Sequence, residues 1–182
     1  MKNFIVIAEA GDFIGEAKLI HQYLNGQWVD NEAEEKIWRM SDGVLWQVIV
    51  TGVGALNVLK TLRNLPSDAR ILNIGYAGSA NYEIGSVVEV SEARLNHPNV
   101  QYSEPCLPLL PLESVWLRPA VRTIPAVCYS NTDFVLQSDY KDCVFDMELA
   151  YIVGMGFSHV SSLKIVSDNL SLHAYREVAA GV

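Results

Sequence analysis

Short apolar runs alternate along this chain with stretches whose apolar residues recur at helical spacing. Buried strands are expected at 3–8, 70–75, 124–130 and 161–168, and a longer strand at 85–95. Helices are expected at 12–24, at 55–65, after Asp146 and near the end at 170–180. This order predicts an α/β protein whose mostly parallel, twisted sheet is flanked by helices. A length of 182 residues suits a single domain spanning 1–182.

Two segments depart from this alternation. Two short apolar runs flank Ser41-Asp42-Gly43, which predicts a β-hairpin. Residues 96–125 contain most of the seven prolines, with "PCLPLLPLE" at their centre. We interpret this segment as an irregular excursion from the sheet and not as a linker between domains.

Composition and charge exclude several classes of partner. Half of the residues are hydrophobic and 19% are charged, which is typical of a globular chain. The net charge of -8 argues against a nucleic acid, because phosphate binding needs a basic face. No apolar stretch approaches the length of a membrane span, and the apolar start of the chain is too short for a signal peptide.

The cysteines, histidines and glycines predict no bound cofactor or metal. Three cysteines without CxxC spacing indicate free thiols and a cytoplasmic protein, and four histidines show no ligand spacing. Gly52 and Gly54 match the start of a dinucleotide fingerprint, but Asn57 stands where its third glycine belongs.

The predicted strands end in small or acidic residues. Ligands of open α/β sheets bind beyond the carboxyl ends of the strands. Those ends hold Glu9, "TGVG" (51–54), "GYAGSA" (75–80), "SNTDF" (130–134), Asp146-Met147-Glu148 and Ser167-Asp168. The sequence therefore predicts a cleft that is rimmed by acids and open enough for a ligand to approach the backbone.

Asp146 and Glu148 bracket Met147 at the start of an apolar helix. Their simplest interpretation is that Asp146 caps the helix and Glu148 favours the positive end of its dipole. Asp168 has a similar alternative, because it could cap the final helix.

Five segments, in their order and spacing, resemble the nucleoside phosphorylase and nucleosidase superfamily. The likeness runs from Phe4 to about Leu172 and is strongest to methylthioadenosine/S-adenosylhomocysteine nucleosidases. The segments that carry it are "TGVGALNV", "ILNIGYAGSA", "IGSVVEVSEARLNH", "FDMELAYI" and "LKIVSDN".

The resemblance implies cleavage of the N-glycosidic bond of a purine nucleoside by water, with acid-assisted release of the base. Asp168 would donate the proton and Ser167 would orient it, while Glu148 would bind the ribose hydroxyls. The further substrate-binding residues that it implies are Met147 against the sugar, Phe134 on the base, and Ala77 and Gly78 at a strand end. The expected partner is a small nucleoside, with neither nucleic acid nor membrane.

The sequence offers three candidates for the residue that activates water. Family members place a glutamate after the first strand, and Glu9, Asp12 and Glu16 all lie in that region. We choose Glu9 because it lies nearest the strand end. The chain also has Lys164 where the family has an arginine and Tyr76 where it has a serine, which affects the expected substrate more than the fold.

The sequence is also compatible with other activities. A phosphorylase needs cations around its phosphate, and Arg94 is the only candidate that the sequence offers for such a cation. A futalosine-type nucleosidase and a non-catalytic nucleoside-binding protein are further alternatives. Family members pair near the active site, and four tryptophans with the apolar segment "PCLPLLPLESVWL" predict a homodimer.

Overall fold

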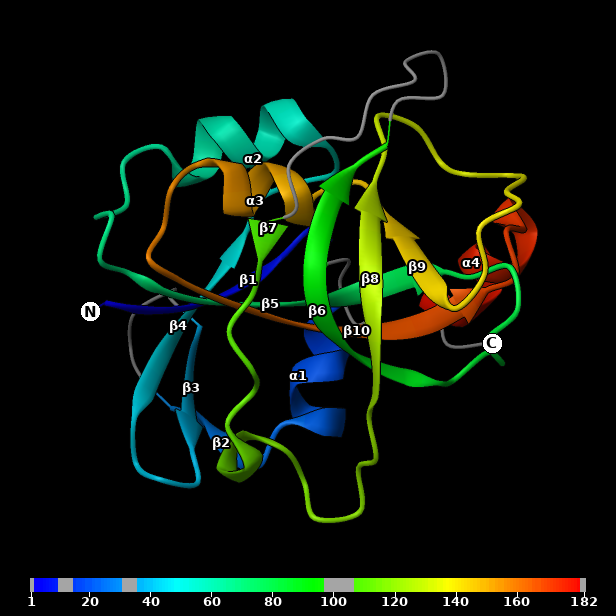
Figure 1. Cartoon of the computed structure of the whole chain (residues 1–182). Coiled ribbons are helices and arrows are strands. Elements are labelled where there is room, and N and C mark those ends of the chain that lie inside the picture. Colours follow the sequence, from blue (N-terminus) through cyan, green and yellow to red (C-terminus); the bar gives the residue numbers. More distant parts are fainter. Residues whose placement is uncertain (1, 10–14, 31–35, 97–106, 181–182) are drawn as a thin grey trace.

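The computed structural model describes residues 2–9, 15–30, 36–96 and 107–180. These residues form ten strands that pair into one sheet, together with four α-helices and a short 3-10 helix, η1 (Ser114–Trp116) (Figure 1). The strands are β1 (Asn3–Ile7), β2 (Gly26–Val29), β3 (Ile37–Met40), β4 (Leu45–Val50), β5 (Arg70–Gly78), β6 (Val87–Leu95), β7 (Leu107–Pro108), β8 (Ile124–Ser130), β9 (Cys143–Asp146) and β10 (His159–Asp168). The helices are α1 (Ala17–Tyr23), α2 (Ala55–Leu62), α3 (Leu149–Gly154) and α4 (Leu172–Ala179).

The sheet is mixed, with five parallel and five antiparallel strand pairs among the described residues. Its centre follows the prediction, since β1 pairs in parallel with β4 and β5, and β5 with β10. The pairs β2–β3 and β3–β4 are antiparallel, as the hairpin signature predicted for the second of them. Antiparallel pairs also join β10 to β6, β5 to β9 and β6 to β7, whereas β6–β8 and β8–β9 are parallel.

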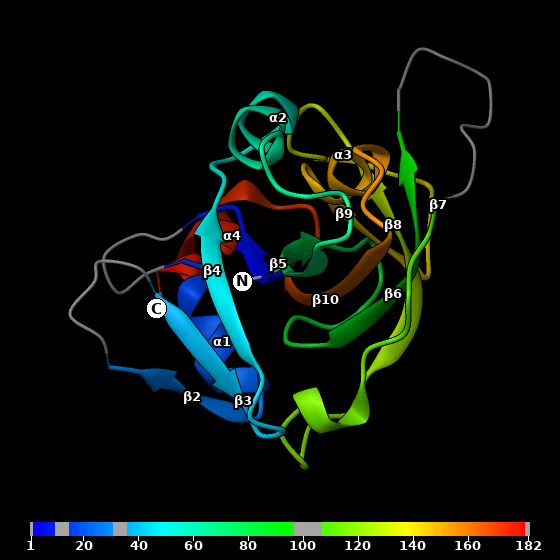
Figure 2. The same ribbon diagram turned by 90° about the vertical axis from the view of Figure 1, so that its left-hand side faces the viewer.

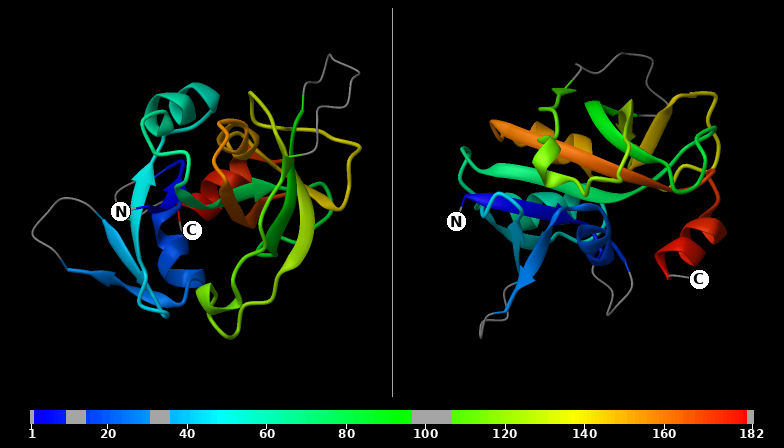
Figure 3. Two further views of the ribbon diagram at one scale, coloured as in Figure 1. Left: turned by 60° about the vertical axis from the view of Figure 1, so that its left-hand side comes forward. Right: turned by 90° about the horizontal axis from the view of Figure 1, so that it is seen from below.

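Five of the strands close into a ring. The pairings run from β5 to β10, β6, β8, β9 and back to β5. In Figures 1 and 3 the long strands β6 and β8 cross over β5 and β10 instead of continuing their plane. The ring brings the ends of β5, β9 and β10 close together, which matters for the site described below.

Two hydrophobic cores lie on opposite faces of the central strands, because side chains alternate along a strand. In β1, Phe4 and Val6 pack with the buried residues of α2 and α3, whereas Ile5 and Ile7 pack with those of α1. Figure 2 shows the same division, with α2 and α3 on one side of β1 and β5 and α1 on the other.

Several elements differ from the sequence prediction. The strands β2 and β9 were not predicted, since each has only four residues and its place depends on pairing with a distant partner. The strand β5 continues three residues beyond the expected 70–75, and α3 begins at Leu149 instead of directly after Asp146. The excursion at 96–125 contains β7 and η1, and its residues 97–106 lie outside the described part. Among the described residues, no helix has the length and apolar character needed to span a membrane.

Candidate active site

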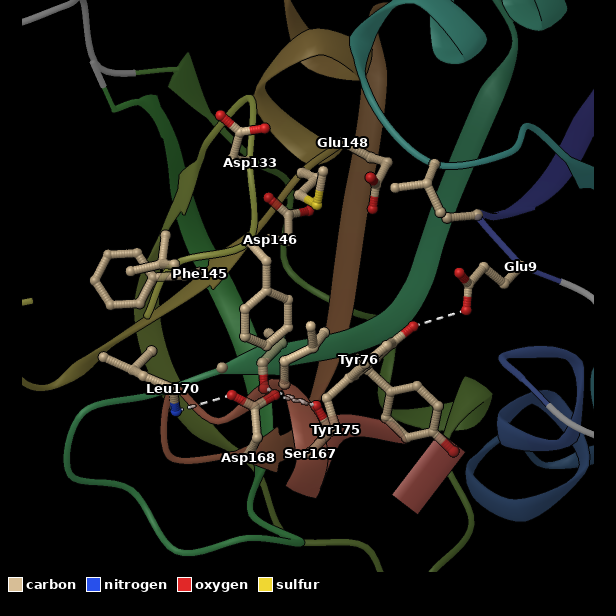
Figure 4. A pocket seen from close by; sticks show the side chains of 18 of the residues that line it. Glu9, Tyr76, Asp133, Phe145, Asp146, Glu148, Ser167, Asp168, Leu170 and Tyr175 are labelled. Atoms are coloured by element: carbon tan, nitrogen blue, oxygen red, sulfur yellow. Dashed lines mark hydrogen bonds between the residues drawn. The ribbon is translucent and has the colours of Figure 1, made fainter. Parts of the chain in front are cut away.

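A pocket of about 320 Å³ lies at the ends of β1, β5, β9 and β10 (Figure 4). The segment 133–135 and the helix α4 complete its wall. All eight residues predicted for the site line it: Glu9, Ala77, Gly78, Phe134, Met147, Glu148, Ser167 and Asp168. Glu16 lines it as well, whereas Asp12 lies outside the described residues.

Asp168 is buried at the end of β10 and accepts two hydrogen bonds. The Ser167 hydroxyl donates to Oδ2 at 2.7 Å, and the Leu170 amide donates to Oδ1 at 2.8 Å. Burial raises the pKa of Asp168 above its usual value, although these hydrogen bonds act in the opposite direction. Asp168 does not cap α4, because Ser171 is its N-cap and accepts the Ala174 amide at 3.2 Å.

Two glycines of β5 give space to two carboxylates. A Cβ at Gly78 would lie 2.9 Å from Oδ1 of Asp168, and a Cβ at Gly75 would collide with the carboxylate of Glu16. Both positions therefore require glycine because a carboxylate approaches the backbone closely, and not because the backbone conformation is unusual.

Glu16 directly precedes α1 and points its buried carboxylate at the ends of β1 and β5. Its Oε1 accepts the amides of Ala8 at 2.7 Å and Glu9 at 3.2 Å, and its Oε2 accepts the Tyr76 amide at 2.7 Å. Burial raises the pKa of Glu16, while Lys164 and these amides oppose the shift. In the sequence Glu16 falls inside the helix expected at 12–24, and only the structure, in which α1 begins at Ala17, places it before the helix. A choice by distance from the strand end passes over it.

Glu9 makes a different contact. Its Oε2 accepts the hydroxyl of Tyr175, on α4, at 2.7 Å (dashed in Figure 4). Glu9 is half-buried, and its carboxylate thus joins the end of β1 to the last helix.

Asp146 is buried and holds the start of α3. Its Oδ2 accepts the amide of Leu149, the first residue of α3, at 2.9 Å, although Glu148 and not Asp146 occupies the N-cap position. The same oxygen lies 2.9 Å from Nζ of Lys164, and both side chains are only 1% exposed. Burial by itself would raise the pKa of Asp146, but the Lys164 ammonium and the hydrogen bonds hold it below its usual value.

Glu148 lies two residues further on, and its Oε2 accepts the Gly54 amide at 2.9 Å. This bond ties it to the glycine turn that precedes α2. Burial and the neighbouring charge of Asp146 raise the pKa of Glu148 to about 8, although Lys164 opposes the shift.

Aromatic side chains form much of the remaining wall. The rings of Tyr76 and Tyr175 meet edge to face at 6.2 Å, and the Phe134 ring lies 5.7 Å from that of Tyr175. Phe145 and Met147 line the pocket from the end of β9. Tyr175 had no sequence signal, because only the docking of α4 brings it to the site. Within the described ranges, no group of three or more His, Cys, Asp or Glu could hold a metal ion.

No protein-family model matches this chain, and no curated protein does. Solved structures of nucleosidases are similar to it. That of Chlamydia trachomatis has a TM-score of 0.69 and 18% identity over 97% of this chain and 89% of its own. The structure from S. pneumoniae has a TM-score of 0.67 and 15% identity, and the match covers 100% of this chain and 93% of its own. The structure from Colwellia psychrerythraea has a TM-score of 0.65 and 14% identity, and the match covers 100% of this chain and 91% of its own. The chain therefore has the fold of the 5′-methylthioadenosine/S-adenosylhomocysteine nucleosidases.

Proposed function

We propose that this protein is a nucleosidase that uses water to cleave the N-glycosidic bond of purine nucleosides of the methylthioadenosine/S-adenosylhomocysteine type. The observation that carries the proposal is one pocket in which Asp168, Glu148 and Glu16 converge from separate elements. Its volume lies in the range usual for small-ligand sites. Similar solved structures hold adenine or a transition-state inhibitor, which suits such a substrate.

Asp168 would act as the general acid on the purine. A purine leaves poorly as an anion, so a carboxylic acid that protonates it during departure lowers the barrier. The raised pKa of Asp168 favours the protonated form that this step needs, and Ser167 would hold its carboxyl group in one orientation. Phe134 would stack on the base, beside Ala77 and Gly78.

Glu148 would bind the ribose hydroxyls and Met147 would pack against the sugar. The free lone pairs of the Glu148 carboxyl group can accept hydrogen bonds from the hydroxyls while its Oε2 retains the bond from the Gly54 amide. Its neighbour Asp146 stays with Leu149 and Lys164, so the two acids that bracket Met147 have separate tasks.

Glu16 is our candidate for the residue that activates water, in place of Glu9. Its raised pKa favours a base that works near neutrality, and Oε2 has one lone pair left beyond the Tyr76 amide. Glu9 is instead bonded to Tyr175. Glu16→Gln should therefore lower kcat more strongly than Glu9→Gln, and equal losses would contradict this choice.

Hydrolysis is favoured over phosphorolysis by the charges around the pocket. Six of its described lining residues are acids and one, Arg176, is basic, and the acids that are ionised would repel phosphate: Glu9, Glu16, Asp133, Asp146, Glu148 and Asp168 are the acids. Arg94, the candidate cation from the sequence, pairs with Glu92 at 2.7 Å and does not line this pocket.

The proposal is tested by incubating the purified protein with 5′-methylthioadenosine and S-adenosylhomocysteine, with and without phosphate. We expect adenine and the free 5-thiosugar at a rate independent of phosphate. A sugar 1-phosphate would identify a phosphorylase, and tight binding without cleavage would identify a nucleoside-binding protein.

We also propose a homodimer, with a basis that differs from the sequence argument. Trp38, Trp46 and Trp116 are buried, so the tryptophans form no exposed cluster. On α2, however, Leu56 and Leu59 are 70% and 53% exposed, next to the pocket-lining Val53. Light scattering should give the mass of two chains, and Leu56→Glu with Leu59→Glu should give that of one. A monomeric parent at micromolar concentration would contradict the dimer.

A cytoplasmic location is proposed as well. It is supported by Cys128 and Cys143, which are buried free thiols of the kind kept in reducing compartments.

A further inference from the structure

Arg176 stands apart from the other residues of the pocket. Among the described residues that line it, Arg176 is the only lysine, arginine or histidine. Its side chain is exposed, whereas Asp168 and Glu148 are buried, so Arg176 lies at the solvent side of the site. The nucleosidase chemistry proposed above has no use for it.

Helix geometry directs Arg176 toward the pocket. Leu172, Tyr175 and Arg176 all line the cavity, and their i, i+3, i+4 spacing places them on one face of α4. Arg176 lies about 6 Å further along the helix axis than Leu172. It is therefore displaced from Asp168, the last residue of β10, which precedes the start of the helix.

The position of α4 itself is fixed by contacts near its end. Nζ of Lys18 donates to the carbonyl oxygens of Val178 at 3.0 Å and Ala179 at 3.2 Å, and the Gly15 amide donates to the latter at 3.2 Å. The bond from Tyr175 to Glu9 holds the middle of the helix. These contacts keep the inward face of α4 over the pocket.

Arg176 has no anionic partner within the described part of the chain. None of the ion pairs formed by the described residues includes Arg176. The acid of its own helix, Glu177, pairs with His173 at 3.0 Å instead. The guanidinium can thus offer a fork of donors to a ligand that reaches the rim.

We propose that Arg176 determines specificity for the 5′ substituent, by selecting nucleosides whose substituent carries a negatively charged group such as a carboxylate. The inference rests on the proposed function. With the base at Asp168 and the ribose at Glu148, the part of the substrate left to reach the exposed rim is the group on C5′. The carboxylates deeper in the pocket would repel an anion, so the rim is where such a charge is tolerated.

The test uses three adenine nucleosides that differ only in the group bonded to the 5′ sulfur. This group is a methyl group, a carboxyethyl group or the amide of the carboxyethyl group. The unsubstituted protein should show a kcat/KM about tenfold higher for the carboxylate than for the amide, since charge-assisted hydrogen bonds exceed neutral ones but exposure weakens them. Arg176→Gln should reduce this ratio to about one. Arg63→Gln, which removes an exposed arginine that does not line the pocket, should keep it.

Salt provides a second readout, because raising the ionic strength should weaken the preference in the parent and have little effect in Arg176→Gln. Equal kcat/KM for carboxylate and amide in the parent, or an unchanged ratio in Arg176→Gln, would overturn the inference while leaving the nucleosidase activity intact. If no adenine is released from any of the three, the proposed function fails, and calorimetric binding then decides. An Arg176-dependent preference for the carboxylate would still support the inference, and equal or absent binding would overturn it.

Discussion

The Asp168 carboxyl group holds two donors, one on each oxygen, and lies in a pocket beside a second buried acid. Because Ser171 caps the start of α4, a capping role for Asp168 cannot account for its burial. We therefore expect Asp168→Asn, which keeps the shape and one acceptor oxygen but has no transferable proton, to lower kcat by about 10²–10⁴-fold with substrate binding largely retained. Initial rates of adenine release and calorimetric binding of a nucleoside measure the two effects. An unchanged kcat would assign Asp168 a purely structural role.

Glu148 should make the stability of the protein depend on pH. Its pKa is about 8 in the folded state against an ordinary value of 4.5, because of burial, then the charge of Asp146, against the opposing Lys164. Between these values the folded chain binds more protons than the unfolded chain, so the free energy of unfolding falls as the pH rises from about 4.5 to 8 and levels off above.

This dependence is checked by thermal unfolding of the parent and Glu148→Gln between pH 5 and pH 9. The variant cannot lose a proton at this position, so its Tm relative to the parent should rise across that interval. The buried acid Asp168, whose pKa shift does not involve Glu148, contributes equally to both proteins and cancels in the difference. Glu83→Gln changes an exposed glutamate and should give a flat difference; a flat difference for Glu148→Gln as well would refute the shift.

At the scale of elements, β5 serves the site through the side chains that it lacks. Gly78→Ala would place a methyl group 2.9 Å from Oδ1 of Asp168 and 3.2 Å from Leu170, so either the acid or the turn behind it must move. We expect kcat to fall by about 10-fold or more, since catalysis is sensitive to small displacements of the acid. Gly154→Ala is the matched control, because its Cβ would meet nothing within 4 Å at the end of α3. Equal kinetics for the two variants would show that β5 tolerates the added carbon.

At the scale of the whole molecule, the buried pair of Lys164 and Asp146 joins β10 to the β9–α3 connection across the ring of strands. Removing one partner leaves a buried charge, so Lys164→Met should lower the free energy of unfolding by about 3–5 kcal/mol. Urea denaturation measures this loss, and adding Asp146→Asn should restore part of it. Lys2→Met removes the lysine of an exposed pair with Asp68 and should change little. A loss no larger than that of Lys2→Met would mean that the pair contributes little to folding.

Local pattern in the sequence was enough for much of this structure. The hairpin around Ser41-Asp42-Gly43, the strand 124–130 and the hydrogen bond from the Leu149 amide to Asp146 each depend on residues close together in the chain. The same applies to the residues that line the pocket, because ligand sites gather at strand ends and strand ends are marked by local composition.

Tertiary structure alone decided the rest, because those features depend on segments far apart in the sequence. The antiparallel pairs that make the sheet mixed, and the short strands β2 and β9, are defined only by their distant partners. The comparison of Glu9 with Glu16 depended on which carboxylate meets the amide of Tyr76 and which meets the hydroxyl of Tyr175. Whether a buried lysine such as Lys164 is charged likewise depends on the partner that the fold brings to it. That partner, Asp146, is distant in the sequence and cannot be identified from the neighbours of Lys164 in the chain.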